Sequence, residues 1–95
     1  MTLIFEWDSL KAEANLRKHG VSFETAAQVF ADPFHLSVQD RIEQAEARWQ
    51  TIGLVGGYYL LLVAHSWIED DEVERVRIIS ARAATRAERR RYEEG

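Results

Sequence analysis

Two apolar runs joined by a pair of glycines limit most strongly how this chain can fold. The runs cover residues 48–55 and 58–67, and Gly56-Gly57 lies between them. Glycine adopts the positive φ angles that two-residue hairpin turns require. The pattern therefore predicts an antiparallel β-hairpin in the middle of the chain.

Capping residues mark two expected helices in the first third of the chain. Asp8 or Ser9 can begin a helix over residues 10–19, and Gly20 suits the position just past its end. A second helix is expected to begin after Ser22, which can cap it. The core-facing stripe of this second helix is Phe23, Ala26, Ala27 and Phe30, and Asp32-Pro33 ends it.

Residues 75–92 combine an expected strand with an expected helix. Residues 76–81 are rich in β-branched side chains, which favour a strand. Thr85 and Glu88 have the spacing of a capping box, which predicts a helix from about residue 86. The segment holds seven of the 12 lysines and arginines of a chain whose net charge is −4. This distribution indicates a local positive site rather than a generally basic surface.

The remaining segments complete an expected sheet. Residues 3–7 and 36–39 are predicted to be short strands, and residues 68–73 an acidic turn. Residues 40–47 are charged and could form a loop or part of the following strand. The resulting order is β-α-α-β-β-β-β-α. Because strands joined by short links pair antiparallel, we expect an α+β fold with an antiparallel sheet, two N-terminal helices and one C-terminal helix.

Length and composition narrow the class of protein. A chain of 95 residues is expected to form one domain over residues 1–95. The absence of cysteine excludes disulfide and thiol chemistry. The N-terminus lacks the basic start of a signal peptide, and the longest apolar stretch, residues 58–64, is too short to span a bilayer. These features predict a cytoplasmic protein without membrane attachment.

Blocks of residues along nearly the whole chain match the pattern of a known family. They are Phe5-Glu-Trp-Asp8, Lys11, Asn15, Lys18-His-Gly-Val21, Phe23, Ala26, Val29-Phe30, Asp32-Pro33, Glu46 with Arg48, Gly53, His65, Arg77-Ile-Ile-Ser-Ala-Arg82, Ala84, Glu88-Arg89 and Tyr92-Glu93. Through these residues the sequence resembles the BrnT family, the toxin half of type II toxin–antitoxin pairs. The resemblance implies a RelE-like fold and a ribonuclease that cleaves RNA and arrests translation. It also implies a BrnA-like antitoxin, whose ribbon-helix-helix domain would contact operator DNA, and no metal or other cofactor.

A ribonuclease that works without a metal needs three kinds of group. One group takes the proton of the 2′-hydroxyl, another can protonate the leaving 5′-oxygen, and cations stabilise charge on the phosphate. Arginine suits the last role because its planar fork pairs with phosphate at two points. The candidate catalytic residues are Lys18, His19, Glu46, Arg48, His65, Arg77 and Arg82.

Counting along the hairpin brings two of these candidates together. With Gly56-Gly57 as the two central turn residues, Val55 is expected to face Tyr58. Counting outward from this pair places Arg48 opposite His65. An adjacent arginine disfavours the imidazolium, so we expect His65 to be neutral and able to act as a base.

Three more candidates are expected near this pair. Arg77 in the last strand is predicted to share the face of His65, with Ile78 and Ser80 on the opposite face. Glu46, two residues before Arg48, would continue the same face if the strand starts early, and could relay or accept a proton. Arg82, just past the strand, could reach the phosphate from the rim.

These assignments have simpler alternatives. Arg48 and His65 could be edge residues that meet only solvent. Lys18 and His19 could only satisfy the carbonyls and the dipole at a helix end.

The arginines of the last helix leave a second function open. Arg86, Arg89 and Arg90 are expected to contact RNA or the antitoxin, or to form a solvated face with i,i+4 ion pairs. The alternative to a ribonuclease is a non-catalytic binding module that holds an acidic partner or nucleic acid through this basic segment.

Overall fold

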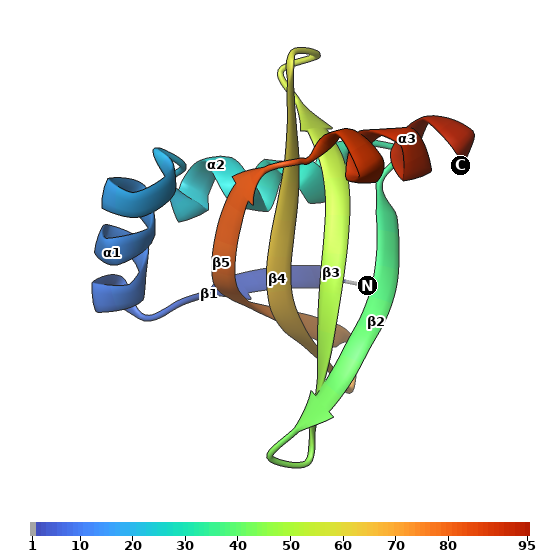
Figure 1. Ribbon diagram of the computed structural model, residues 1–95. Helices are drawn as coiled ribbons and strands as arrows, with labels where there is room; N and C mark the ends of the chain where they lie inside the picture. Colours follow the sequence, from blue (N-terminus) through green and yellow to red (C-terminus); the bar gives the residue numbers. More distant parts are fainter. Residues whose placement is uncertain (1) are drawn as a thin grey trace.

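The computed structural model describes residues 2–95 and places a five-stranded sheet at the centre of the molecule (Figure 1). The strands are β1 (Thr2–Glu6), β2 (Leu36–Glu43), β3 (Glu46–Val55), β4 (Tyr59–Asp70) and β5 (Val73–Ala83). The helices are α1 (Ser9–His19), α2 (Phe23–Ala27), the 3₁₀-helix η1 (Gln28–Ala31) and α3 (Arg86–Glu94). This order confirms the predicted sequence of elements, with η1 as an addition to the second helix.

The sheet is mixed rather than antiparallel. Its strand order is β1-β5-β4-β3-β2, and antiparallel pairs connect β2 through to β5. β1 instead runs parallel to β5 at the edge of the sheet, so the predicted antiparallel RelE-like sheet is wrong at this strand. Helices separate β1 from the next strand in the chain, so no short connection fixes its partner or its direction.

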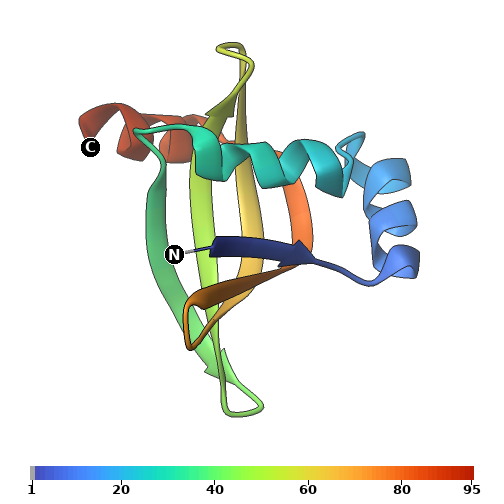
Figure 2. The same ribbon diagram turned by 180° about the vertical axis from the view of Figure 1, so that it is seen from behind.

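The two faces of the sheet are covered to different extents, as Figures 1 and 2 show from opposite sides. α2 and η1 lie over one face, which we call the core face. α3 crosses only one end of the other face, which we call the open face. α1 lies beside the edge of β5.

The predicted helix ends are confirmed. Asp8 caps the start of α1, and Gly20 follows its end with a φ of 71°. Ser22 caps α2 by accepting a hydrogen bond from a backbone N–H at 3.1 Å. Thr85 and Glu88 form both hydrogen bonds of the capping box at the start of α3.

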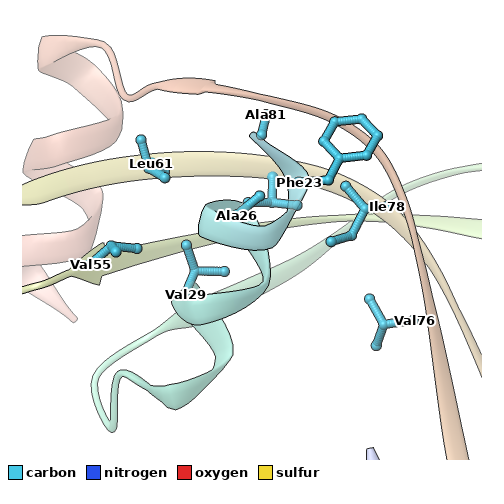
Figure 3. Packing of buried hydrophobic residues seen from close by; sticks show 9 residues of the cluster. Phe23, Ala26, Val29, Val55, Leu61, Val76, Ile78 and Ala81 are labelled. Carbon is cyan, nitrogen blue, oxygen red and sulfur yellow. The ribbon is translucent and has the colours of Figure 1, made fainter. Parts of the chain in front are cut away.

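Phe23, Ala26 and Val29 are fully buried against the core face (Figure 3). Their spacing of three residues fits the tightening of the chain to 3₁₀ geometry after α2. The predicted stripe is therefore confirmed at Phe23 and Ala26. Val29 completes the buried row, whereas Ala27 and Phe30 are only partly buried.

Asn15 explains why α1 has no clear apolar stripe. Its side chain is buried, and its Nδ2 donates to the carbonyl of Ala81 at 2.9 Å while the N–H of Ala81 donates to its Oδ1 at 3.1 Å. β1 pairs with β5 only as far as Arg77, so Asn15 supplies ladder hydrogen bonds beyond the end of β1. An amide, rather than apolar burial, thus anchors α1 to the sheet.

The hairpin of β3 and β4 differs by one residue from the predicted register. Gly56 and Gly57 have positive φ angles of 64° and 68°, and the N–H of Tyr58 donates to the carbonyl of Val55 at 3.2 Å. The ladder nevertheless begins with Val55 opposite Tyr59. Because Tyr58 is an additional loop residue, every later pair shifts by one.

Both charged connections are shorter than predicted. β2 continues to Glu43 and turns at Gln44-Ala45, so residues 40–43 extend the preceding strand, while Glu46 and Ala47 belong to the following strand, as the second alternative predicted. β4 continues to Asp70, and the acidic turn contains only Asp71-Glu72. The long strands extend the open face well beyond the end covered by α3.

Candidate functional site

The one-residue shift places His65 in the core instead of beside Arg48. His65 pairs with Trp49, and Arg48 pairs with Ser66. Because neighbouring residues of a strand point to opposite faces, Arg48 and His65 lie on opposite sides of the sheet. His65 is 0% exposed, and its ring centroid lies 5.0 Å from that of Phe30. The predicted pairing of Arg48 with His65 is therefore wrong.

A chain of hydrogen bonds satisfies both ring nitrogens of His65. Nδ1 lies 3.0 Å from the carbonyl oxygen of Ser66, which can only accept, so Nδ1 carries the proton. Nε2 then accepts from the hydroxyl of Thr51 at 2.7 Å, and that hydroxyl accepts from Ser37 at 2.7 Å. Burial lowers the pKa of His65 to about 4, against the opposing effect of the Ser66 carbonyl. The ring is neutral because it is buried, and not because an arginine lies beside it.

Arg48, Ser66 and Arg77 form a row across the open face, which we call the arginine row. Ser66 is the direct partner of Arg48 in β3 and of Arg77 in β5. Directly opposed side chains point to the same face, with their Cβ atoms about 5 Å apart. Arg77 therefore shares the face of Arg48, and the prediction that it shares the face of His65 is wrong. Ile78 is the residue that pairs with His65.

Two β-bulges lie beside the arginine row. Asp40 has no partner in the ladder of β2, and Ile79 has none in the ladder of β5. Such bulges often lie next to functional sites because they re-aim the side chains that follow. The bulge at Ile79 returns Ser80 to the open face opposite Ala64, so the predicted alternation is wrong from this point onward.

A groove of about 330 Å³ crosses the open face between the two bulges. The small side chains of Ala64 and Ser80 leave room for it in the middle of the sheet. Charged and polar groups from several elements converge on this space. They include Lys11 from α1, Arg48 and Gln50 from β3, and Asp40 and Arg41 from β2.

Glu46 and Arg48 are neighbours, as predicted. A guanidinium nitrogen of Arg48 lies 3.9 Å from a carboxylate oxygen of Glu46, and another lies 3.9 Å from one of Glu43. These separations are too long for hydrogen bonds, so the guanidinium donors have no side-chain acceptor among residues 2–95. The side chains of Arg48 and Glu46 are 21% and 34% exposed, so both are accessible to solvent, and Arg48 also lines the groove.

Arg82 is held within the protein. Its two terminal nitrogens donate to the carboxylate of Glu88 at 2.8 and 2.9 Å. This hydrogen bond from Arg82 lowers the pKa of Glu88 to about 2, although partial burial opposes the shift. Because Glu88 also belongs to the capping box, the pair anchors the start of α3. The structure thus gives Arg82 an internal partner rather than a free guanidinium.

Asp32 fixes the other end of α3. The hydroxyl of Tyr92 donates to its Oδ2 at 2.6 Å, and the N–H of Leu54 donates to the same atom at 2.8 Å. Partial burial opposes the charged form of Asp32, but these hydrogen bonds prevail and lower its pKa. The same contact raises the pKa of Tyr92 to about 12.

Lys18 and His19 lie away from the groove. Both are exposed in the last turn of α1, where the helix dipole stabilises positively charged side chains. They are about 10 Å along the helix axis from Lys11, which lines the groove. Arg86, Arg89 and Arg90 are also exposed, on α3.

Within residues 2–95, no three histidine, cysteine, aspartate or glutamate side chains gather closely enough to hold a metal ion. No helix in the same range is long and apolar enough to cross a membrane.

Four residues at the groove or in the arginine row are not identifiable as site residues from the spacing of the sequence. Lys11 and Ser80 belong to the family pattern, and this is the signal that points to them. Gln50 and Ser66 carry no such signal, because their positions depend on the strand register and on the bulges. Three of the four line the groove, and Ser66 lies at the centre of the arginine row.

Comparison with known proteins places the chain in a family. The family model described as "Ribonuclease toxin, BrnT, of type II toxin-antitoxin system" matches residues 7–88. The crystal structure of the Brucella abortus ribonuclease toxin BrnT is similar in fold, with a TM-score of 0.69 and 22% sequence identity over 90% of this chain and 100% of that one. No curated protein matches the sequence. The chain belongs to the BrnT family of ribonuclease toxins of type II toxin–antitoxin systems.

Proposed function

We propose that this protein is a metal-independent endoribonuclease and that its active site is the arginine row together with the adjoining groove on the open face. The observation that carries the proposal is the placement of Arg48 and Arg77 in one row, with the carboxylate of Glu46 beside Arg48. Arginine forks stabilise the negative charge that builds on a phosphate during its transfer. The family supports RNA as the substrate, because its toxins are described as ribonucleases.

The proposed reaction is attack of the RNA 2′-oxygen on the adjacent phosphorus. The new bond forms as the bond to the 5′-oxygen breaks, which leaves a 2′,3′-cyclic phosphate and a free 5′-hydroxyl. Glu46 takes the proton of the 2′-hydroxyl, since its carboxylate is partly exposed beside Arg48. Lys11, which enters the groove from α1, gives a proton to the 5′-oxygen. Arg48 and Arg77 hold the phosphate oxygens.

His65 has no catalytic role in this proposal. Its ring is fully buried on the core face, and both of its nitrogens already have partners. Lys18 and His19 are the next candidates if variants in the groove leave cleavage intact.

We further propose a BrnA-like antitoxin with a ribbon-helix-helix domain as the partner, and contact with operator DNA only through that domain. The toxin half of a type II pair requires an antitoxin, because a free ribonuclease would harm its host. The exposed Arg86, Arg89 and Arg90 on α3 offer a positive patch for an acidic antitoxin segment or for RNA phosphates. Expression of the protein should arrest growth, and co-expression with the neighbouring gene product should restore it. Harmless expression, with no protein copurifying, would contradict this assignment.

A non-catalytic binding module is the second candidate function. The net charge of −4 favours the module over a ribonuclease that binds RNA without sequence preference, because proteins of the latter kind are usually positive. A module of this kind would use the same basic residues but would leave its ligand intact.

Incubation of the purified protein with total RNA in EDTA separates these possibilities. We expect the wild type to cleave RNA, and Arg77→Ala to cleave roughly 10²–10³-fold more slowly, as for loss of one oxyanion donor. Arg17→Ala is the matched control, because Arg17 is an exposed arginine of α1 in the last turn. Binding without cleavage would support the module, and cleavage that EDTA abolishes would contradict metal independence.

A further inference from the structure

The hydroxyl of Ser66 is unusual among the buried polar groups of this protein. Ser66 is 1% exposed, and its Oγ is the only buried side-chain nitrogen or oxygen without a hydrogen-bond partner among residues 2–95. Buried hydroxyls are almost always hydrogen-bonded, since an unpaired one destabilises the fold. A ligand that binds from outside the chain can supply the missing partner.

The position of Ser66 shows from which side that partner would come. Ser66 is directly opposed by Arg48 on one strand and by Arg77 on the other, so its side chain points to the open face. The preceding residue, His65, points into the core and is fully partnered. The orphan hydroxyl therefore lies at the centre of the arginine row.

Both arginines of the row retain free donors. The nearest carboxylate oxygens to Arg48 are 3.9 Å away, and Arg77 makes no ion pair with any residue in the range 2–95. Arg41 and Arg82, by contrast, each donate to a carboxylate at 3.1 Å or less. Two guanidinium groups with free donors thus flank Ser66.

Donors from three neighbouring strands at one point match a ligand with several acceptor oxygens and negative charge. A phosphate group has this form: arginine forks bind two of its oxygens, and a hydroxyl can donate to a third. Side-chain rotations of surface arginines take picoseconds to nanoseconds, so Arg48 and Arg77 can turn outward and admit an oxygen to the hydroxyl between them.

We propose that Ser66, Arg48 and Arg77 form a phosphate subsite in which the Ser66 hydroxyl donates to a backbone phosphate of the RNA. The proposal rests on the proposed function for the identity of the ligand, but not for the existence of the subsite. Ser66 is a substrate-binding residue in this arrangement, and it transfers no proton.

Titration with inorganic phosphate, followed by NMR, tests the subsite without any need for cleavage. In the wild type we expect the Nε–H signals of Arg48 and Arg77 and the amide signal of Ser66 to shift with one shared dissociation constant. Loss of one hydrogen bond to a charged ligand should make phosphate binding to Ser66→Ala about tenfold weaker. Ser66→Cys, which keeps a side chain of similar size but only a weak donor, should also weaken it. Ser9→Ala, at the exposed start of α1, is the control and should bind like the wild type.

The midpoint of thermal unfolding of each variant shows whether weaker phosphate binding results from misfolding. Because Ser66→Ala removes an unpartnered buried hydroxyl, its midpoint should equal or exceed that of the wild type. Phosphate binding that Ser66→Ala leaves unchanged would overturn the subsite, even if RNA cleavage is confirmed. Binding of acetate as tight as that of phosphate would also overturn it and would indicate a site for a carboxylate of a protein partner. A subsite that binds phosphate in a protein that never cleaves RNA would refute the ribonuclease and leave the subsite standing.

Discussion

His65 and Ser66 are adjacent in β4 but lie in opposite environments. His65 points to the core face, where both ring nitrogens are hydrogen-bonded and aromatic rings surround it. Ser66 points to the open face, where its hydroxyl has no partner and two arginines flank it. A polar group that the protein satisfies internally serves the fold, whereas one left unsatisfied among free cations is available to a ligand. Because of this difference, we expect a ligand to bind on the open face near Ser66 and not beside His65.

The open face shows the same contrast along its length. At the end covered by α3, Arg82 is paired with Glu88 and Tyr92 with Asp32, so the polar groups there hold the helix in place. Beyond α3, the guanidinium of Arg48 has no hydrogen-bond partner within residues 2–95. The predictions that follow test whether satisfied groups carry stability and unsatisfied ones carry binding.

The largest expected loss of stability comes from His65→Ala. The substitution leaves a cavity beside Phe30 and removes the partners of Thr51 and of the Ser66 carbonyl. We expect the free energy of unfolding in urea to fall by about 3–5 kcal/mol. RNA cleavage per folded molecule should persist. A variant that folds as stably as the wild type but no longer cleaves would show instead that the histidine is catalytic.

Acidification should destabilise the wild type through the same histidine. The pKa of His65 is lowered from 6.5 to about 4 on folding, so the unfolded chain binds the proton more readily. The contribution to stability is therefore complete above pH 6.5 and decreases as the pH falls to about 4, by up to about 3 kcal/mol. The measurement is urea unfolding at several pH values, with His65→Phe as the control that lacks the titrating group. Equal pH dependence of the two proteins over this range would contradict the buried, neutral ring.

Asn15→Ala should have the next largest effect. It leaves the backbone N–H and carbonyl of Ala81 and the carbonyl of Val21 without their partners at the edge of β5. We expect a loss of about 2–3 kcal/mol in the free energy of unfolding, because these groups are largely buried. Hydrogen exchange of the Ala81 amide should become faster. An unchanged exchange rate would mean that α1 is held by other contacts.

The smallest effect is expected for Tyr92→Phe. It removes one hydrogen bond to Asp32 at the surface end of α3, where Asp32 keeps its bond to the N–H of Leu54. The expected loss is about 1 kcal/mol or less in thermal unfolding. Tyr58→Phe is the control, because Tyr58 is 77% exposed in the hairpin loop. Equal midpoints for the two variants would show that the contact with Asp32 does not stabilise α3.

Local features of the fold could be predicted from the sequence, and non-local ones could not. The caps at Asp8, Ser22 and Thr85 and the end of α1 just before Gly20 depend on a few adjacent residues, and all are confirmed. The direction of β1 depends on a partner at the far end of the chain, so no local pattern encodes it.

The candidate site was harder to predict because it depends on strand register. One additional residue, Tyr58, moves His65 from the face of Arg48 to the core, since a slip of one residue exchanges the two faces of a strand. The bulge at Ile79 then brings Ser80 to the face of Arg77. The neighbourhood of Glu46 and Arg48 could be predicted, because residues two apart in one strand share a face whatever the register.

NMR signals of arginine and tryptophan side-chain N–H groups can compare RNA binding at the two faces of the sheet in one experiment. Arg48 and Arg77 report on the open face through their Nε–H signals, while Trp7 and Trp67, which pack against the core aromatics Phe23 and Phe30, report through their indole N–H signals. The ligand is an RNA strand with 2′-fluoro groups, which keeps the phosphates but lacks the attacking hydroxyl. We predict that the signals of both arginines shift with increasing RNA while the indole signals stay in place. Shifts confined to the tryptophans, with unchanged arginines, would contradict an RNA site on the open face.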